Sequence, residues 1–497
     1  MSDTPTRQPS TFPRHRLIGL LSGPLLAAAM LLSPAPEGLS QQGWWIAGVG
    51  VLMAVWWMTE AVPLAVTALA PLILFPILGI RDIAATTPGY AHPLVFLFLG
   101  GFLLARAIQV WGLDRRLALR VLDLVGARPR HVIAGIMGVT AFLSMWVSNT
   151  ATAMVMLPIG QSIIATFAAK NAAKSPVMSP GRADDIGPPL MLGIAYAATI
   201  GGMGTIIGTP PNAIFAAYMA GSHGIEISFV RWMFIGVPLV LVLLPLAWLV
   251  LTRLAFHVPA GHGVDETEIV ADGISKLGTM SRAERLVAAV MLLVAFCWVF
   301  RPLLLTVLPN LKISDTGIAL MGAMLLFILP VDLKAGRFLL SWKEAAQIRW
   351  DVLILFGGGL TLAAAIGDSD LAGWIGAQLI GLRTLPLILF LLIVGTFLVL
   401  LSELASNTAT AAIFVPIAGA AAVAMGEPVY ALALPVALFA TLGFMLPVGT
   451  PPNAVIFGSG AVEMRHMIRA GSILDIMGIV AVTVTIMSLG TWVFGPG

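Results

Sequence analysis

The chain has 497 residues, of which 59% are hydrophobic and 10% charged, and its mean hydropathy is +0.97. Soluble domains usually carry roughly 25% charged residues, so this composition excludes a soluble protein and indicates a polytopic membrane protein. The single cysteine excludes an internal disulfide framework, and the net charge of +3 reflects membrane orientation, with no nucleic-acid partner implied.

Apolar windows long enough to cross a bilayer as helices recur along the whole chain. The first follows Arg14 and Arg16 and resembles a signal peptide, but we interpret it as an uncleaved span because the topology below requires it. Eleven spans are predicted, near residues 17–33, 44–61, 63–80, 92–112, 189–220, 229–253, 284–308, 316–331, 351–367, 429–460 and 471–494.

Two further apolar stretches, 132–169 and 384–424, carry polar triplets at their centres, where a simple span would be most apolar. The triplets are Ser148-Asn149-Thr150 and Ser406-Asn407-Thr408, and each is followed by Ala-Thr and later by Pro-Ile, at a constant offset of 258 residues. We interpret both stretches as re-entrant hairpins, which enter and leave the membrane on one side, with the triplet at the tip.

A second motif also occurs twice, as Gly208-Thr209-Pro210-Pro211-Asn212-Ala213 and again from Gly449 to Ala454, at an offset of 241 residues. Two consecutive prolines remove two backbone donors, so a helix cannot run unbroken through 189–220 or 429–460. Freed backbone groups are tolerated at that depth only where they line a polar cavity or meet a ligand. Two breaks at equivalent positions favour a binding site over simple proline kinks.

The two motifs recur in the same order and therefore define an internal repeat. Residues 1–43 form a cytoplasmic tail and leading span, 44–256 form repeat one, 257–283 form a cytoplasmic joint, and 284–497 form repeat two. Each repeat holds five spans and one hairpin, and because five is odd the second repeat is inverted in the membrane. The predicted fold class is therefore an all-α polytopic membrane protein with inverted repeats, which is typical of secondary transporters.

The positions of lysine and arginine predict the orientation. With a cytoplasmic N-terminus, the inner segments hold 21 of the 27 basic residues and the outer segments hold four, namely Arg81, Arg231, Lys312 and Arg383. This bias follows the positive-inside rule and predicts a multi-pass protein of the inner (plasma) membrane, with both hairpins non-spanning.

The tips and the breaks combine hydroxyl and amide groups without any lysine or arginine. Hydroxyl and amide donors bind carboxylates, their oxygens bind small hard cations, and helix N-termini favour anions. A divalent anion then needs positive charge from co-bound cations. Ser144 and Ser402 lie one helical turn before each triplet and are predicted to add an oxygen ligand for a cation. The alternative is that these polar groups only join helices.

Two charged residues, Glu403 and Arg106, lie within the apolar stretches. Glu403 is the one carboxylate inside a hairpin, and its repeat partner is Met145. A structural hydrogen-bonding role and a proton-linked role are both open for it. Arg106 lies within a span and is expected to snorkel or to pair locally.

The paired motifs closely resemble those of the divalent anion:sodium symporter family, whose members import C4-dicarboxylates, citrate or sulfate, and the resemblance covers nearly the whole chain. It implies contacts between the substrate carboxylates and Asn149, Thr150, Ser406, Asn407 and Thr408, with Thr450 and Pro451 nearby. It implies one sodium ion near Ser144, Ser148, Asn149 and the break from Gly204 to Thr209, and another near Ser402, Asn407 and the backbone of 446–450, including Gly449.

The resemblance also implies a homodimer in the lipid membrane and a transport domain that moves like an elevator against a fixed scaffold. The leading hypothesis is sodium-coupled uptake of a C4-dicarboxylate such as succinate, malate or fumarate. Sodium-independent dicarboxylate exchange, sodium-coupled citrate or sulfate transport, and a passive anion channel are the alternatives within transport. An enzyme is disfavoured, because no acid-base pair or metal-binding group lies beside the tips.

Overall fold

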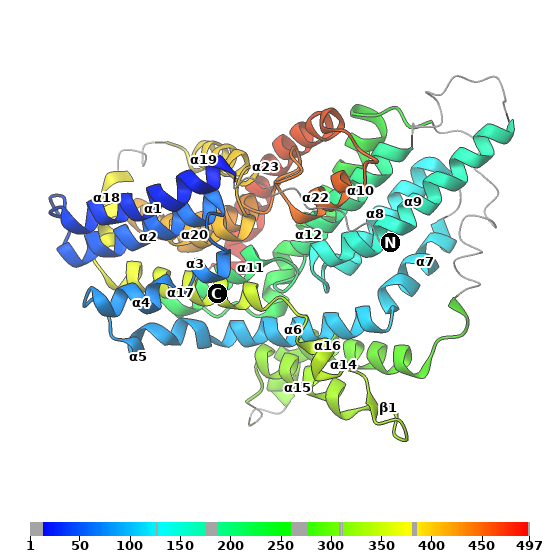
Figure 1. The fold of residues 1–497 in the computed structure, drawn as a ribbon, viewed down its shortest axis with the longest axis horizontal. Helices are drawn as coiled ribbons and strands as arrows, with labels where there is room; N and C mark the ends of the chain where they lie inside the picture. Colours follow the sequence, from blue (N-terminus) through cyan, green and yellow to red (C-terminus); the bar gives the residue numbers. More distant parts are fainter. Residues whose placement is uncertain are drawn as a thin grey trace, which may run out of the picture.

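The computed structural model describes residues 13–125, 128–174, 186–259, 277–307, 310, 312–379 and 385–495. The tail before Pro13 and the part of the predicted joint from 260 to 276 lie outside the described residues. Over the described residues the chain is almost entirely helical (Figure 1), which confirms the predicted all-helical fold in its coarse form.

Eight helical segments within the described ranges are long and apolar enough to cross a bilayer. They are Arg14–Leu32, Ile83–Val110, Asn149–Phe167, Phe229–Leu254, Arg282–Val307, Trp350–Asp368, Asn407–Met425 and Met464–Phe494. Shorter apolar segments are Leu64–Ile77, Asp315–Ile328, Leu387–Ser402 and Val429–Phe439. The count of eleven spans and two re-entrant hairpins stays a prediction of the sequence.

The chain begins with two packed helices, α1 (Arg14–Leu32) and α2 (Gln41–Thr59). The side chain of Ser40 caps the first turn of α2. Glu60 ends α2 in the left-handed region, with φ of 48°, and it is the one non-glycine residue with positive φ among the described residues. Its carboxylate pairs with Arg16 at 2.9 Å and so joins the end of α2 to the start of α1.

Two short helices, α3 (Leu64–Thr67) and α4 (Ala70–Ile77), stand where one continuous span at 63–80 was predicted. The structure differs from the prediction because Pro71 has no N–H with which to continue the hydrogen-bond ladder of α3. A new helix begins instead, with this proline in its first turn.

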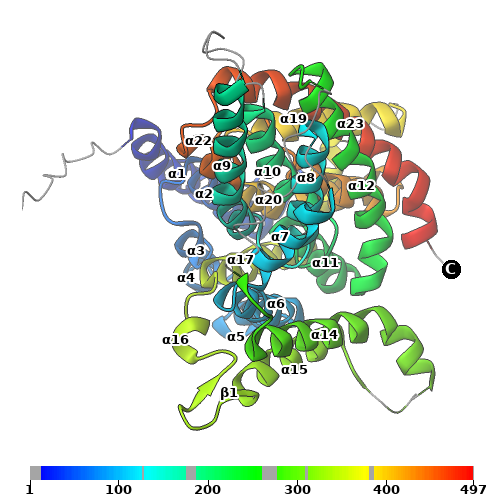
Figure 2. The ribbon, with the colours of Figure 1, turned by 90° about the vertical axis from the view of Figure 1, so that its right-hand side faces the viewer.

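Helices α14 and α15 and strand β1 lie together below α6 in Figure 2. Helix α7 was not predicted as a span, because it is amphipathic and carries a charged face with Arg115, Arg116 and Arg120. The elements are α5 (Ile83–Thr86), η1 (Thr87–Ala91), α6 (Pro93–Val110), α7 (Leu113–Val125), α14 (Arg282–Val307), α15 (Asp315–Ile328), α16 (Trp342–Ala345), α17 (Trp350–Asp368) and α18 (Leu371–Leu379).

A short antiparallel pair of strands, β1 (Pro330–Asp332) and β2 (Arg337–Phe338), is the departure from an all-helical chain. The sequence between them turns tightly, because the Asp332 carboxylate accepts hydrogen bonds from two backbone N–H groups of the loop. Gly336 supplies a φ of 61°, which suits glycine.

The two duplicated motifs lie between pairs of helices. The triplet pairs are α8 (Pro129–Ser144) with α9 (Asn149–Lys174), and α19 (Leu387–Ser402) with α20 (Asn407–Met425). The proline-containing pairs are α10 (Gly187–Gly202) with α11 (Pro210–His223), and α21 (Val429–Phe439) with α22 (Pro451–Gly458). The remaining helices are α12 (Phe229–Leu249), the π-helical turn η3 (Val250–Leu254) and the long α23 (Met464–Phe494).

The core of the protein contains the first helix of each proline-containing pair. Almost every residue of α10 is buried, and all of α21 from Tyr430 to Phe439 is buried. A helix that is apolar and buried all round must be enclosed by other helices. In contrast, only 22% of the apolar window of α14 is buried, so its apolar side chains face outward, as expected of a surface in contact with lipid.

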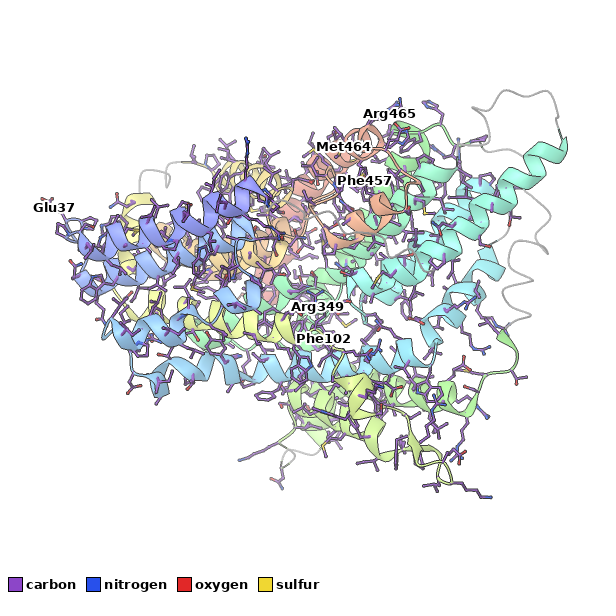
Figure 3. The ribbon with its side chains drawn as sticks, in the orientation of Figure 1. Glu37, Phe102, Arg349, Phe457, Met464 and Arg465 are labelled. Carbon is purple, nitrogen blue, oxygen red and sulfur yellow. The ribbon has the colours of Figure 1, made fainter. Side chains whose placement is uncertain are left out.

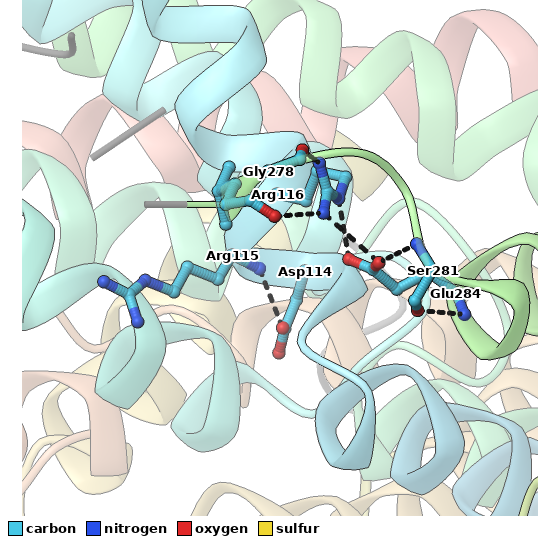
Figure 4. Close-up of polar contacts among 7 residues, drawn as sticks. Asp114, Arg115, Arg116, Gly278, Ser281 and Glu284 are labelled. Carbon is cyan, nitrogen blue, oxygen red and sulfur yellow. Dashed lines mark hydrogen bonds and ion pairs between the residues drawn. The ribbon is translucent and has the colours of Figure 1, made fainter. Parts of the chain in front are cut away.

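A buried ion pair joins α7 to the start of α14 (Figure 4). Arg116 Nε lies 2.6 Å from Glu284 Oε1, and both side chains are less than a tenth exposed. The guanidinium also donates to the carbonyl oxygens of Leu277 and Gly278, and the backbone N–H of Ser281 donates to Glu284. The pair is therefore fully hydrogen-bonded, as a buried charge requires.

Candidate functional site

A cavity of about 870 Å³ lies where both Ser-Asn-Thr triplets meet both Thr-Pro-Pro-Asn segments. These segments come from four different helix pairs and from positions separated by up to about three fifths of the chain. The residues from them that line the cavity are Ser148, Asn149, Thr150, Gly208, Thr209, Pro210, Ser406, Asn407, Thr408, Gly449, Thr450 and Pro451. All seven residues predicted to contact the substrate are thus brought together, and their individual roles stay predictions.

Four helices begin at residues that line this cavity. Helix α9 begins at Asn149, α20 at Asn407, α11 at Pro210 and α22 at Pro451. Prolines in the first turn suit a helix start, because their missing N–H would have no partner there in any case. Each helix N-terminus carries a partial positive charge, so the four together favour an anion in the cavity.

Oxygen atoms gather behind the first triplet, where one sodium ion was predicted. Ser144 is fully buried, and its hydroxyl donates to the Ala198 carbonyl at 2.6 Å. The Asn149 amide fits its surroundings with its nitrogen turned toward the carbonyl oxygens of Ala198 and Gly208, at 3.2 Å each, and toward the Ser144 hydroxyl, at 2.8 Å. We call the Ser144 hydroxyl, the Asn149 amide and these two carbonyls the first oxygen cluster, since hydroxyl, amide and carbonyl oxygens are the ligands that a small hard cation prefers.

A second oxygen cluster lies behind the second triplet. The buried Ser402 hydroxyl is 3.2 Å from the Ala440 carbonyl and 3.0 Å from the Leu442 carbonyl. The Asn407 amide likewise fits with its nitrogen turned toward the carbonyl oxygens of Ala440, at 3.2 Å, and Gly449, at 2.9 Å. The two clusters have the same composition, with one serine, one asparagine and carbonyls of a broken span.

The predicted sodium-site residues are distributed between the cavity and these clusters. Ser148 and Thr209 line the cavity, whereas Ser144 and Ser402 do not line it and lie buried in the clusters. Gly204 does neither, and its N–H donates to the carbonyl of Gly201 in the last turn of α10.

Two asparagines had no predicted role. Each of them holds the loop of one break in place through hydrogen bonds. Asn212 donates from its side chain to the carbonyls of Gly202 and Thr205, at 2.9 and 2.8 Å. Asn453 donates in the same way to Gly443 and Leu446, at 3.0 Å each. The signal was present in the sequence, because both asparagines end the duplicated Thr-Pro-Pro-Asn motif.

Glu403 makes the two halves of the site unequal. Its buried carboxylate accepts hydrogen bonds from the backbone N–H groups of Met445 and Leu446, at 2.6 and 2.7 Å. In the first half the Thr205 hydroxyl instead donates to the carbonyl of Met145. Glu403 therefore has the structural hydrogen-bonding role that was one of its two predicted roles, and the proton-linked role stays untested.

A tyrosine connects the two halves of the site. Tyr196 of α10 is fully buried, and its hydroxyl donates to the carbonyl of Phe444 at 2.9 Å. Phe444 lies in the loop that carries the second oxygen cluster, whereas Ala198, two residues after Tyr196, belongs to the first. This bond joins residues 248 positions apart, and no pattern in the sequence indicates it.

Arg106 does not line this cavity. Its guanidinium donates to the side chain of Gln109, one helical turn away, and to the carbonyl of Glu344 and the side chain of Gln347, which are more than 200 residues away in the sequence. The expected local pairing therefore describes only the contact with Gln109.

Substitution of Gly201 should disturb the first oxygen cluster, because α8 and α10 touch at this glycine. A Cβ atom on Gly201 would lie 2.2 Å from the backbone oxygen of Ala141, so Gly201→Ala must push α10 away from α8. Overpacking of this kind costs about 1–3 kcal/mol. We expect a clear fall in thermal stability together with at least roughly a tenfold fall in transport rate, because one helix carries Ala198 and the other Ser144.

The matched control is Gly138→Ala on the facing helix α8, where nothing lies within 4 Å of the added Cβ. This variant should keep its transport rate and gain up to about 1 kcal/mol of stability, since alanine favours a helix over glycine. Equal behaviour of the two variants would contradict the close packing at Gly201.

Comparison with known proteins shows that this chain is similar to sodium-dependent transporters. The family model described as the sodium:sulfate symporter transmembrane region matches residues 15–495. The sodium-dependent dicarboxylate transporter SdcS of Staphylococcus saprophyticus is 39% identical over 487 residues, which cover 97% of this chain and 92% of that protein. The SdcS protein of Staphylococcus aureus strain USA300 is 37% identical over 483 residues, with the same coverage.

Among solved structures, the YdaH transporter of Alcanivorax borkumensis matches with a TM-score of 0.57 at 13% sequence identity, over 97% of this chain and 98% of that one. This likeness concerns the fold alone. The named relatives are transporters, which agrees with the expectation that the chain is a transporter and not an enzyme. Since the family model spans nearly the whole chain, the protein belongs to the sodium:sulfate symporter family, the divalent anion:sodium symporters that its paired motifs resemble.

Proposed function

We propose that the protein is a secondary transporter that uses the sodium gradient to take up C4-dicarboxylates, such as succinate, malate and fumarate, across the plasma membrane. The observation that carries this proposal is the arrangement of two equivalent oxygen clusters beside a cavity on which four helix N-termini converge. Sodium ions in the two clusters offset the charge of a dianion held by the triplets. The names of the two SdcS relatives support both the ion and the substrate class.

An organic dianion suits this cavity better than sulfate does. Leu404 and Val448 lie beside the second triplet, line the cavity, and are 70% and 69% exposed. Phe102 and Leu355 add apolar surface to the same cavity. A dicarboxylate has a carbon chain that can cover such side chains, whereas sulfate presents only oxygen atoms. Sodium-coupled transport of citrate or sulfate is therefore the second candidate.

The same proposal covers the assembly and the movement. The protein has eleven spans, two re-entrant hairpins and two inverted repeats, it forms a homodimer, and its N-terminus is cytoplasmic. The equivalent hydrogen bonds of Asn212 and Asn453 support the repeat relation. The triplets and breaks form a transport domain that moves like an elevator against a scaffold that includes α2, α6 and α17.

The cavity also has a direction under this proposal. Its lining includes Arg16 and Arg349, whose side chains are 41% and 51% exposed, so water reaches the cavity at these residues. The positive-inside rule assigns both to the cytoplasmic side. The structure then corresponds to the state that is open to the cytoplasm.

Uptake of radiolabelled succinate into proteoliposomes tests the proposal. We expect accumulation above the external concentration with an inward sodium gradient, and no accumulation when potassium replaces sodium. Unlabelled sulfate and citrate, added in excess, should compete less well than unlabelled malate. Uptake that ignores sodium and requires internal dicarboxylate would instead make the protein an exchanger.

A further inference from the structure

We propose that Arg349 is an additional docking residue for the substrate at the cytoplasmic mouth of the cavity, and that Asp351 limits its attraction for the dianion. This inference rests on the proposed function and adds a specificity-determining pair to it. The triplets and breaks contain no basic residue. Among the described residues, the basic side chains that line the cavity are His15, Arg16 and Arg349.

Arg349 and Asp351 form a close pair at the beginning of α17. Arg349 Nε lies 2.8 Å from Asp351 Oδ1, and Arg349 Nη2 lies 2.7 Å from Asp351 Oδ2. The pair uses the planar, two-pronged geometry with which guanidinium groups bind carboxylates. Arg349 Nη1 makes no hydrogen bond to any residue that the structure describes, so the group can still donate to a second carboxylate.

The surroundings of this pair indicate a role in binding and not in holding the fold together. Both partners lie at the start of one helix, two residues apart, and both side chains are about half exposed. Arg16, by comparison, joins two different helices through Glu60 and buries its Nε. Ion pairs as exposed as Arg349–Asp351 add little stability.

The position of the pair predicts how it acts. Arg349 faces the same cavity as the triplets but belongs to α17, which the proposed function places in the scaffold. A dicarboxylate that leaves the triplets toward the cytoplasm can therefore exchange one of its contacts for Arg349, in competition with Asp351. When the transport domain moves outward, the substrate leaves Arg349 behind, so the pair should affect only the cytoplasmic face.

Measurement of KM for succinate on each face of the full-length protein tests this inference. Right-side-out and inside-out membrane vesicles would be compared for Arg349→Gln, Asp351→Asn and the double variant. Arg349→Gln leaves an unpaired negative charge and should raise the cytoplasmic KM by about three- to tenfold. Asp351→Asn leaves an unpaired positive charge and should lower the cytoplasmic KM by a similar factor. The double variant should lie close to the unsubstituted protein, and the external KM should stay unchanged throughout.

Arg465→Gln is the matched control. Arg465 pairs with Glu463 at the same two-residue spacing and is also exposed, but it does not line the cavity and lies at the edge of the molecule in Figure 3, far from Arg349 in that view. It should change neither KM. The unchanged external KM of each variant also shows that the variant is folded, since a structural defect would affect both faces.

Two results would overturn the inference alone, with sodium-driven succinate transport intact. One is an unchanged cytoplasmic KM in all three variants, and the other is a shift of both single variants in the same direction. Absence of sodium-driven succinate transport by the unsubstituted protein would instead overturn the proposed function, and this inference with it.

Discussion

Replacement of Asn149 or Asn407 by alanine should reduce sodium-driven uptake by about a hundredfold or more. Each asparagine lines the cavity at the start of its helix and also places its side-chain amide in one of the two oxygen clusters. Under the proposed function the substitution therefore removes a ligand for the cation and a donor for the anion in one step. Loss of a hydrogen bond to a charged group costs about 1.5–3 kcal/mol, so two such losses account for the expected effect.

The measurement is uptake of labelled succinate at saturating sodium, together with the rise in melting temperature that sodium produces. Asn149→Ala and Asn407→Ala should lose both the uptake of succinate and the rise in melting temperature with sodium. Asn407→Asp is the matched control, because it keeps an oxygen for the cation but adds a negative charge beside the dianion. It should keep the thermal response to sodium and lose uptake. Normal uptake by either alanine variant would show that the asparagines do not contact the transported species.

Replacement of Glu284 by alanine should destabilise the protein by about 3–5 kcal/mol, because it leaves the buried guanidinium of Arg116 without its counter-charge. Two backbone carbonyls would remain as its partners, and the side chain is only 9% exposed. The check is a thermal unfolding curve of the purified protein in detergent. Sodium affinity of the protein that remains folded should be unchanged, since the pair does not line the cavity.

A double variant distinguishes the effect on stability of removing both charges from the effect of removing only one of them. Arg116→Met with Glu284→Leu replaces both charges by apolar groups of similar size, which for buried pairs is often neutral or stabilising. We expect it to recover most of the stability that Glu284→Ala loses. A double variant as unstable as the single one would mean that the charges themselves hold α7 against α14.

The sequence predicted the parts of the fold that depend on local chemistry. Consecutive prolines predicted where the helices are interrupted, and α11 and α22 indeed begin at Pro210 and Pro451. The long apolar helices were predicted from composition alone. The break within the span at 63–80 was not predicted, because the apolar run hid the effect of Pro71 on the helix. Helix α7 was missed for the opposite reason, since its charged face lowers its mean hydropathy.

The candidate site was predictable in its residues and not in its geometry. The duplicated motifs identified the residues that meet at the cavity, but the meeting of asparagine amides with carbonyl oxygens depends on how separate helices pack. Arg349 was counted only as an orientation charge, because nothing near it in the sequence indicates that the start of α17 reaches the cavity. Contacts between distant segments, such as those of Arg106 and Arg116, likewise have no local pattern that predicts them.

The hydrogen bond from Tyr196 to Phe444 has a consequence for the order in which ions bind. It ties the helix that carries Ala198 to the loop that carries Gly449, so the two oxygen clusters cannot tighten independently. If the two clusters hold sodium ions as proposed above, the first ion to bind meets the entropic cost of ordering both segments, and the second ion finds them already ordered. Under that proposal the bond favours positive cooperativity between the two ions.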